Sequence, residues 1–218
     1  MKVASAISRS ALFLGIFAAL AAALIAWTWN TTKADIERSV RAAEARQLLE
    51  IFPANTHNNS LIDDRFTLEA DTPLLELRRD RSGYTVRHNN GVVGVILPAT
   101  ARDGYSGDIE LLVGINSDGT VAGARVVSHK ETPGLGDGID IRKSPWILSF
   151  TGRSLASPLQ PDWGVKKDGG AFDQFTGATV TPRAVVAAIR RTLEFQTLHR
   201  TQLFEVDVAD NSTEETGP

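Results

Sequence analysis

The sequence contains no cysteine. Without thiols the chain can form no disulfide bond, can ligate no iron–sulfur cluster through cysteine, and cannot hold a flavin through a cysteine thioether. Its four histidines, at positions 57, 88, 129 and 199, stand far apart, and no zinc-type spacing occurs among them. We therefore expect no metal site formed by this chain.

The motifs of several enzyme classes are missing as well. The sequence holds no Gly-x-Ser-x-Gly nucleophile motif, no P-loop and no dinucleotide-binding fingerprint. The formal net charge of −3 gives no reason to expect nucleic acid as a partner. We predict that the chain does not bind NAD or ATP itself and carries no catalytic residue that acts on a small substrate alone.

The composition fits a globular domain with an anchor. Of the 218 residues, 42% are hydrophobic and 22% are charged, which is typical of a folded rather than a disordered chain. This length is sufficient for one sizeable domain and a membrane anchor.

The N-terminal segment predicts a membrane-spanning helix. An uncharged run covers residues 11–29, close to the roughly 20 residues that cross a bilayer as a helix. Trp27 and Trp29 stand at its outer end, where aromatic belts occur. Lys2 and Arg9 precede the run, so the positive-inside rule places the N-terminus in the cytoplasm and the rest of the chain on the other side.

A cleaved signal peptide is the alternative for the same segment. Such a peptide has a shorter apolar core and a cleavage site of small residues, which Ala21-Ala22-Ala23 could imitate. The apolar run continues past these alanines and ends in tryptophans, which favours an uncleaved anchor.

Residues 32–52 show an amphipathic helical pattern. Apolar residues such as Ile36 and Val40 recur at helical spacing among charged ones, and Pro53 ends the pattern. We expect a solvated stalk that carries the domain away from the membrane. A contact surface for a neighbouring membrane subunit is the alternative.

The middle of the chain predicts an antiparallel sheet, because β-branched residues are concentrated there. Asn116-Ser117-Asp118-Gly119 is expected to be a hairpin turn, since Asp-Gly suits positions with φ > 0. The acidic segment 68–79 could be an edge strand or a loop. The expected strands are 84–86, 91–99, 109–115 and 121–128.

The fold class that we predict is α+β. A helix at 182–198 follows the sheet, and the polar, acidic tail is expected to be disordered. The expected organisation is a cytoplasmic tip and transmembrane anchor at 1–31, a stalk helix at 32–53, a sheet domain at 54–206 and the tail at 207–218.

The stretch Asp173-Gln174-Phe175-Thr176-Gly177-Ala178-Thr179-Val180-Thr181-Pro182-Arg183 leads into that helix. Thr181 is suited to be the N-cap, and Pro182 suits the first helical position. Thr179 would then lie just before a helix N-terminus, where unpaired N–H groups and the positive dipole end favour an anion such as a phosphate. A capped helix after a tight turn, without any ligand, is the alternative.

A second informative stretch follows the last expected strand. It reads His129-Lys130-Glu131-Thr132-Pro133-Gly134-Leu135-Gly136. Proline and two glycines so close together predict a rigid turn whose backbone can meet a ligand closely. An ordinary strand-ending loop is the other interpretation.

These stretches resemble the signatures of the FMN-binding domain family, found in the G subunit of Rnf complexes and the C subunit of sodium-pumping NADH:quinone reductases. Residues 173–179 are similar to the family's flavin-attachment motif, and residues 129–136 to its second signature. Gly104-Tyr105-x-Gly107 also resembles the family, and residues 163–170 resemble the run before the attachment motif in the G subunit.

The resemblance implies one FMN per chain, joined through its phosphate to Thr179 by a phosphoester bond. The loop 131–136 is then the candidate to lie along the isoalloxazine ring, where its backbone groups would set the redox potential. The other cofactor-binding residues that the resemblance implies are Thr176, Gly177, Ala178, Glu131, Thr132, Gly134, Leu135 and Lys167.

Several nearby side chains keep two interpretations. Lys166, Lys167 and Arg183 could pair with the FMN phosphate or be solvated cations, the second being favoured more for Arg183 than for Lys167. His129 could be a proton partner of the flavin, although a structural histidine at a strand end is favoured. Asp173 could be recognised by the enzyme that attaches FMN, or it could cap the local turn.

The function that the resemblance implies is a redox relay in an ion-translocating electron transport complex of the bacterial inner membrane, with the main domain in the periplasm. The implied partners are the other membrane and iron–sulfur subunits, and a flavin transferase that uses FAD and a divalent metal. Three alternatives stay open: a quinone-reductase C subunit, against which residues 163–170 argue, a stand-alone flavin reductase, and a cofactor-free scaffold subunit.

Overall fold

The computed structural model describes residues 2–89 and 91–204. The chain divides into two compact units, Met1–Glu44 and Ala45–Pro218. The acidic tail expected at 207–218 lies outside the described residues.

The first unit is formed by the N-terminal part of one long helix, α1 (Lys2–Ile51). Within the described residues, this is the one helix long and apolar enough to cross a membrane. Large hydrophobic side chains from Leu12 to Trp29 are exposed along it, as a lipid-facing segment requires. The expected anchor and stalk are thus parts of a single helix, which ends just before Pro53 as predicted.

The second unit is built on a five-stranded antiparallel sheet whose strands follow one another in sequence order. The four predicted strands are confirmed, each extended by a few residues or none, and a short edge strand is added. Gly119, with φ = +85°, supplies the positive φ of the predicted hairpin turn. The strands are β1 (Arg65–Leu68), β2 (Arg81–His88), β3 (Gly91–Ala101), β4 (Ile109–Asn116) and β5 (Val121–Ser128).

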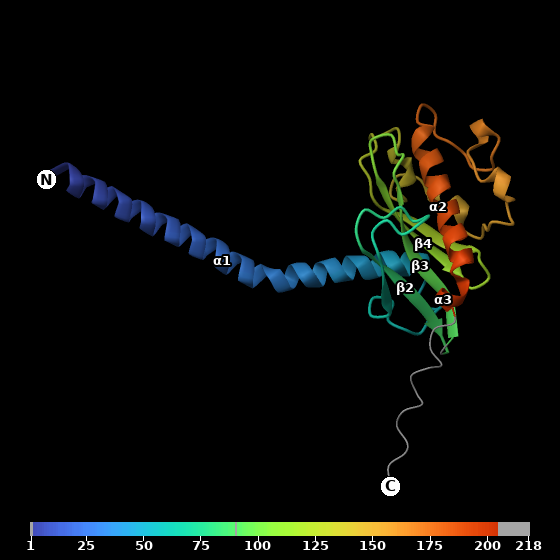
Figure 1. The fold of residues 1–218 in the computed structure, drawn as a ribbon, viewed down its shortest axis with the longest axis horizontal. Coiled ribbons are helices and arrows are strands. Elements are labelled where there is room, and N and C mark those ends of the chain that lie inside the picture. Colours follow the sequence, from blue (N-terminus) through green and yellow to red (C-terminus); the bar gives the residue numbers. More distant parts are fainter. Residues whose placement is uncertain (1, 90, 205–218) are drawn as a thin grey trace, which may run out of the picture. The chain divides into compact units, whose positions relative to one another are not determined.

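Side chains point alternately to the two faces of the sheet along each strand, and each face packs into its own hydrophobic core. Val95 and Leu97 of β3 join a core with α2 (Val180–Leu198), whereas Ile96 between them joins a second core with Leu48 of α1. Figure 1 shows α2 lying along the sheet. A short helix, α3 (Arg200–Phe204), ends the described chain.

The long connection between β5 and α2 contains four short 3₁₀ helices, Asp137–Ile139, Pro145–Phe150, Gln160–Asp162 and Lys166–Asp168. Aromatic rings fix this connection to the core. The rings of Trp146 and Phe175 meet edge to face at 5.3 Å, and Trp146 Nε1–H donates a hydrogen bond of 2.8 Å to the backbone oxygen of Asp173. The segment that leads to Thr179 therefore has a fixed path.

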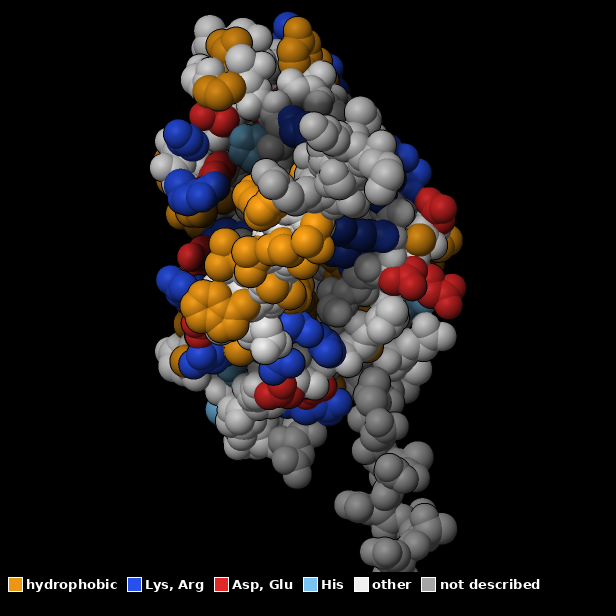
Figure 2. Space-filling model, turned by 90° about the vertical axis from the view of Figure 1, so that its left-hand side faces the viewer, with side chains coloured by type: hydrophobic (Ala, Val, Ile, Leu, Met, Phe, Trp, Pro, Cys, Tyr) orange, Lys and Arg blue, Asp and Glu red, His pale blue; other side chains and the backbone are white. Residues whose placement is uncertain are grey.

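The acidic segment after β1 is a series of turns rather than a strand. Its carboxylates meet arginines of the domain: Asp71 pairs with Arg102 at 2.7 Å, and Glu76 pairs with Arg191 of α2 at 2.9 Å. Figure 2 shows acidic and basic side chains interspersed on the face that it presents. Ion pairs near the surface contribute little stability individually, so the cores hold the fold.

The packing of α1 on the sheet predicts different tolerances for two paired glycines, Gly114 of β4 and Gly123 of β5. A Cβ at Gly114 would lie 2.2 Å from Ile51 Cγ2, whereas one at Gly123 would have its nearest neighbour, Ile51 Cα, at 3.5 Å. We expect Gly114→Ala to lower the free energy of unfolding by about 1–3 kcal/mol, and Gly123→Ala by less than about 1 kcal/mol. Urea denaturation of a soluble form beginning at Thr32 measures both, and equal losses would contradict this packing.

Candidate functional site

Three segments that are distant in sequence meet around a cavity of about 390 Å³ in the second unit. They are the loop before β4, the loop after β5 and the turn into α2. The lining residues are Tyr105, Glu131, Thr132, Leu135, Gly136, Gly177, Ala178, Thr179, Val180 and Thr181. The two sequence signatures at 129–136 and 173–179 therefore form opposite parts of one site.

The start of α2 gives this cavity an electropositive wall. Thr179 is half-buried at the N-cap position, and its carbonyl accepts the first helical hydrogen bond, from Arg183 N–H at 3.2 Å. The N–H groups of Val180 and Thr181 precede any possible intrahelical acceptor, and Pro182 has no N–H. Two backbone donors and the positive dipole end thus lie beside the Thr179 hydroxyl.

The predicted capping role of Thr181 is wrong. Thr181 lies within the first turn of α2, is 1% exposed, and donates its hydroxyl to Glu131 Oε2 at 2.5 Å. The N-cap position belongs to Thr179, whose side chain makes no capping hydrogen bond within the part of the chain that the structure describes. Thr181 is not the cap because α2 begins before it, at Val180, and its hydroxyl donates instead to the Glu131 carboxylate.

Two tight turns face the cavity, and each needs glycine at its third position. In the first, Leu135 N–H donates to the Thr132 carbonyl at 3.1 Å, and Gly134 has φ = +76°. In the second, Ala178 N–H donates to the Phe175 carbonyl at 3.1 Å, and Gly177 has φ = +80°. Both turns that the Pro-Gly and Gly-Ala sequences predicted are formed, and residues of each turn line the cavity.

Glu131 lies at the base of the site and is 4% exposed. Its Oε1 atom accepts a hydrogen bond of 2.9 Å from Ser106 N–H, and its Oε2 atom accepts the one from Thr181. Its own N–H donates to His129 Nδ1 at 3.1 Å. His129 therefore has a structural partner in the loop.

The cations near the attachment motif form ion pairs with carboxylates of this chain. Arg183 makes two hydrogen bonds to Asp168, at 2.7 and 2.9 Å, which lower the pKa of Asp168 and raise that of Arg183. Lys166 pairs with Asp173 at 2.6 Å. Lys167 lies close enough to help to lower the pKa of Asp168. None of these cations lines the cavity.

Not all sequence-predicted residues share one cavity. Thr176 and Gly134 line a neighbouring cavity of about 660 Å³, together with Asp137 and Lys143. Leu135, which is 49% exposed, lines both cavities and separates them. Lys167 lines neither.

The lining residues that sequence reasoning did not assign to the site are Tyr105, Val180 and Thr181. Tyr105 stands in the Gly-Tyr-x-Gly stretch that resembled the family, so that signal was present but was given no role. No local pattern shows that Thr181 faces Glu131, because the two are 50 residues apart. Among the described residues, no group of three His, Asp or Glu side chains could hold a metal ion.

Two family models match parts of this chain, and several relatives match most of its length. Residues 104–194 match the model of the FMN-binding domain, and residues 1–51 match that of the RnfG N-terminal region. The G subunit of the ion-translocating oxidoreductase complex of Pseudomonas aeruginosa (strain UCBPP-PA14) is 46% identical over 201 residues, covering 92% of this chain and 94% of the relative. The corresponding subunits of Vibrio vulnificus and Shewanella loihica are 43% and 42% identical, covering 91% and 87% of this chain and 93% and 89% of the relatives. The chain therefore belongs to the family of G subunits of ion-translocating oxidoreductase complexes and carries the FMN-binding domain of that family.

Proposed function

We propose that this chain carries one FMN, covalently attached by a phosphoester bond to Thr179 Oγ1, and relays electrons within a multi-subunit membrane complex. The observation that carries the proposal is the position of Thr179. This half-buried residue lines a cavity at the start of a 19-residue helix, together with residues of the loop 131–136.

The surroundings of Thr179 suit a phosphate. A phosphodiester keeps one negative charge, which the N–H groups of Val180 and Thr181 and the dipole of α2 stabilise. Arg183 and Lys166 are already paired with Asp168 and Asp173. The helix start, rather than a dedicated arginine, is therefore the main phosphate-binding element that we propose.

The cavity beside Thr179 suits the flavin ring. Its volume of about 390 Å³ falls in the range of small-molecule sites, and its lining is mostly apolar or backbone. Leu135, Gly136 and Gly177 would hold the ring, and Thr132 would supply a hydroxyl at its edge. The bound flavin supplies the electron chemistry, while these residues exclude water from it and fix its surroundings.

Covalent attachment fits the expected location. The charges before the apolar part of α1 favour a cytoplasmic N-terminus and an extracytoplasmic domain. A cofactor held there cannot be replaced from a cytosolic pool, and a weakly bound flavin would be lost by dilution. A bond to Thr179 removes that loss.

Membership of this family supports a role between redox partners. The relatives are subunits of ion-translocating oxidoreductase complexes. We infer that this chain passes electrons among the membrane and iron–sulfur subunits of such a complex, between ferredoxin-type donors and NAD. A flavin transferase that uses FAD and a divalent metal is the second partner that the proposal requires.

Intact mass of the full-length chain, produced in cells that supply the flavin transferase, tests the attachment. We expect the wild-type mass to exceed the sequence mass by one FMN less one water, and Thr179→Ala to lose this increment, because no other threonine hydroxyl takes its place. Thr197→Ala, at an exposed threonine of α2 that lines neither cavity, is the control and is expected to keep the increment. An unmodified wild-type chain, in cells where another substrate of the transferase is modified, would favour the cofactor-free scaffold.

The orientation makes a separate prediction. Alkaline phosphatase fused after Phe204 is expected to be active in cells, because it reaches the periplasm with the domain, whereas green fluorescent protein at the same point is expected to be dark. The opposite pair of results would place the domain in the cytoplasm and remove the reason given for covalent attachment.

A further inference from the structure

The start of α2 is held in place from outside the helix. Thr179 occupies the N-cap position without making a side-chain cap among the described residues, so no local side chain satisfies the first N–H groups of the helix. A helix start of this kind frays readily unless another group holds it. The Thr181 hydroxyl, two residues after Thr179, is bonded to Glu131 and supplies that hold.

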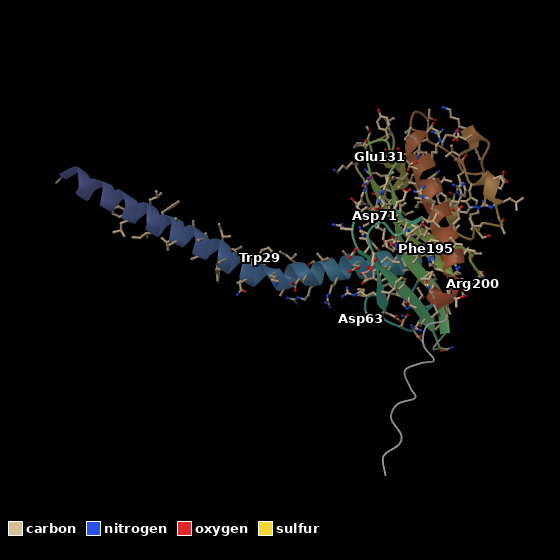
Figure 3. All side chains as sticks on the ribbon, in the orientation of Figure 1. Trp29, Asp63, Asp71, Glu131, Phe195 and Arg200 are labelled. Atoms are coloured by element: carbon tan, nitrogen blue, oxygen red, sulfur yellow. The ribbon has the colours of Figure 1, made fainter. Side chains whose placement is uncertain are left out.

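Glu131 connects all three segments of the site. It belongs to the loop after β5, accepts from Ser106 N–H of the loop before β4, and accepts from Thr181 of α2. Ser106 directly follows Tyr105, which lines the cavity. In Figure 3, Glu131 lies toward one end of the domain, whereas Arg200, after α2, lies toward the other end.

The space around this carboxylate is closely filled. A Cβ at Gly136 would lie 2.8 Å from Thr181 Oγ1 and 2.9 Å from Glu131 Oε2, and one at Gly104 would lie 3.0 Å from Glu131 Oε1. Two glycine backbones thus enclose the hydrogen-bonded group. We call Glu131, Ser106 N–H and Thr181 the Glu131 clamp.

A buried carboxyl is a poor source of stability, because removing it from water offsets much of what its hydrogen bonds contribute. Its presence under the cavity is better explained by what it positions. We propose that Glu131 is a positioning residue: its clamp holds the Thr179 hydroxyl and the loop 131–136 in the arrangement that flavin attachment requires. This inference rests on the attachment to Thr179 proposed above.

The reaction that the clamp serves has a defined balance. The bond between Thr179 Oγ1 and the FMN phosphorus forms, the pyrophosphate bond of FAD breaks, AMP leaves, and the hydroxyl proton passes to a base of the transferase. The rate depends on how the acceptor hydroxyl is presented, since a misplacement of about 1 Å can cost on the order of a hundredfold.

The test uses the full-length chain in detergent, purified without flavin from cells that lack the transferase. Purified transferase, FAD and Mg²⁺ are then added, and intact mass follows attachment over time. Thr181→Val keeps the side-chain shape but removes the hydroxyl, and we expect it to slow attachment roughly tenfold to a hundredfold. Thr181→Ser, which keeps the hydroxyl, is expected to stay within about threefold of wild type.

Thr192→Val is the matched control on the same helix. Thr192 is fully buried, and its hydroxyl donates to the Ala188 carbonyl at 2.8 Å, so this change also removes one buried hydrogen bond. We expect its attachment rate to stay within about threefold of wild type, since it lies far along α2 from the cavity. If Thr192→Val slows attachment as much as Thr181→Val, general destabilisation explains both and the proposal is overturned.

Glu131 itself is tested by two replacements of similar size. Glu131→Met removes both acceptors and is expected to slow attachment at least as much as Thr181→Val. Glu131→Gln can accept from Ser106 and donate to a reversed Thr181 hydroxyl, and is expected to recover most of the rate. A wild-type rate in Glu131→Met would overturn the proposal, and if that variant fails to fold, the Thr181 pair decides.

A readout without flavin separates positioning from other effects. Hydrogen–deuterium exchange of the apo chain is expected to be faster at Ser106 and in the first turn of α2 in Thr181→Val, and unchanged there in Thr192→Val. If FMN is attached to the wild-type chain and to Thr181→Val at equal rates, the clamp is overturned and the proposed function stands. A wild-type chain that is never modified at Thr179 would overturn both the clamp and the proposed function.

Discussion

The hydrogen bonds of one buried carboxylate hold the site together. Glu131, in the loop after β5, accepts hydrogen bonds from Ser106 in the loop before β4 and from Thr181 in α2. It therefore joins both loops to the start of α2. The rest of the domain supplies the frame for this contact. The sheet fixes the ends of β4 and β5, α2 is packed on one face through Val185 and Ile189, and the end of α1 covers the other face through Leu48. Thr179 lines the cavity because the sheet and α2 fix the ends of the loops that form it.

The architecture was largely predictable because local patterns determine it. Concentrated β-branched residues marked the strands, Asp118-Gly119 marked the hairpin, and the Pro-Gly and Gly-Ala stretches marked the two turns with positive φ. The extent of α1 was predicted in two parts, since the apolar run and the amphipathic run differ in character although the helix is continuous. The edge strand β1 and the turns after it were left open, because few local signals separate a short edge strand from a loop.

The hydrogen-bond partners inside the site were not predictable in the same way. Thr181 has the residue type and spacing of an N-cap, and only the fold shows that its hydroxyl is taken by Glu131, 50 residues earlier. Ser106 is 25 residues from Glu131 and contributes its backbone N–H. Any residue except proline has this group, so the sequence does not identify the contact. The sequence left Arg183 and Lys166 open as phosphate partners or solvated cations, and only the fold shows that they pair with Asp168 and Asp173. Long-range pairing, rather than composition, decides the role of each.

The most direct measurement of the central claim is the location of the flavin within the tryptic peptide 168–183 of the native protein. This peptide contains Thr176, Thr179 and Thr181, of which the first faces a neighbouring cavity and the last is bonded to Glu131. Fragmentation by electron transfer, which keeps the phosphoester intact, assigns the modified residue. The account predicts FMN on Thr179 alone. FMN on Thr181 or Thr176, or an unmodified peptide from cells with an active transferase, would contradict it.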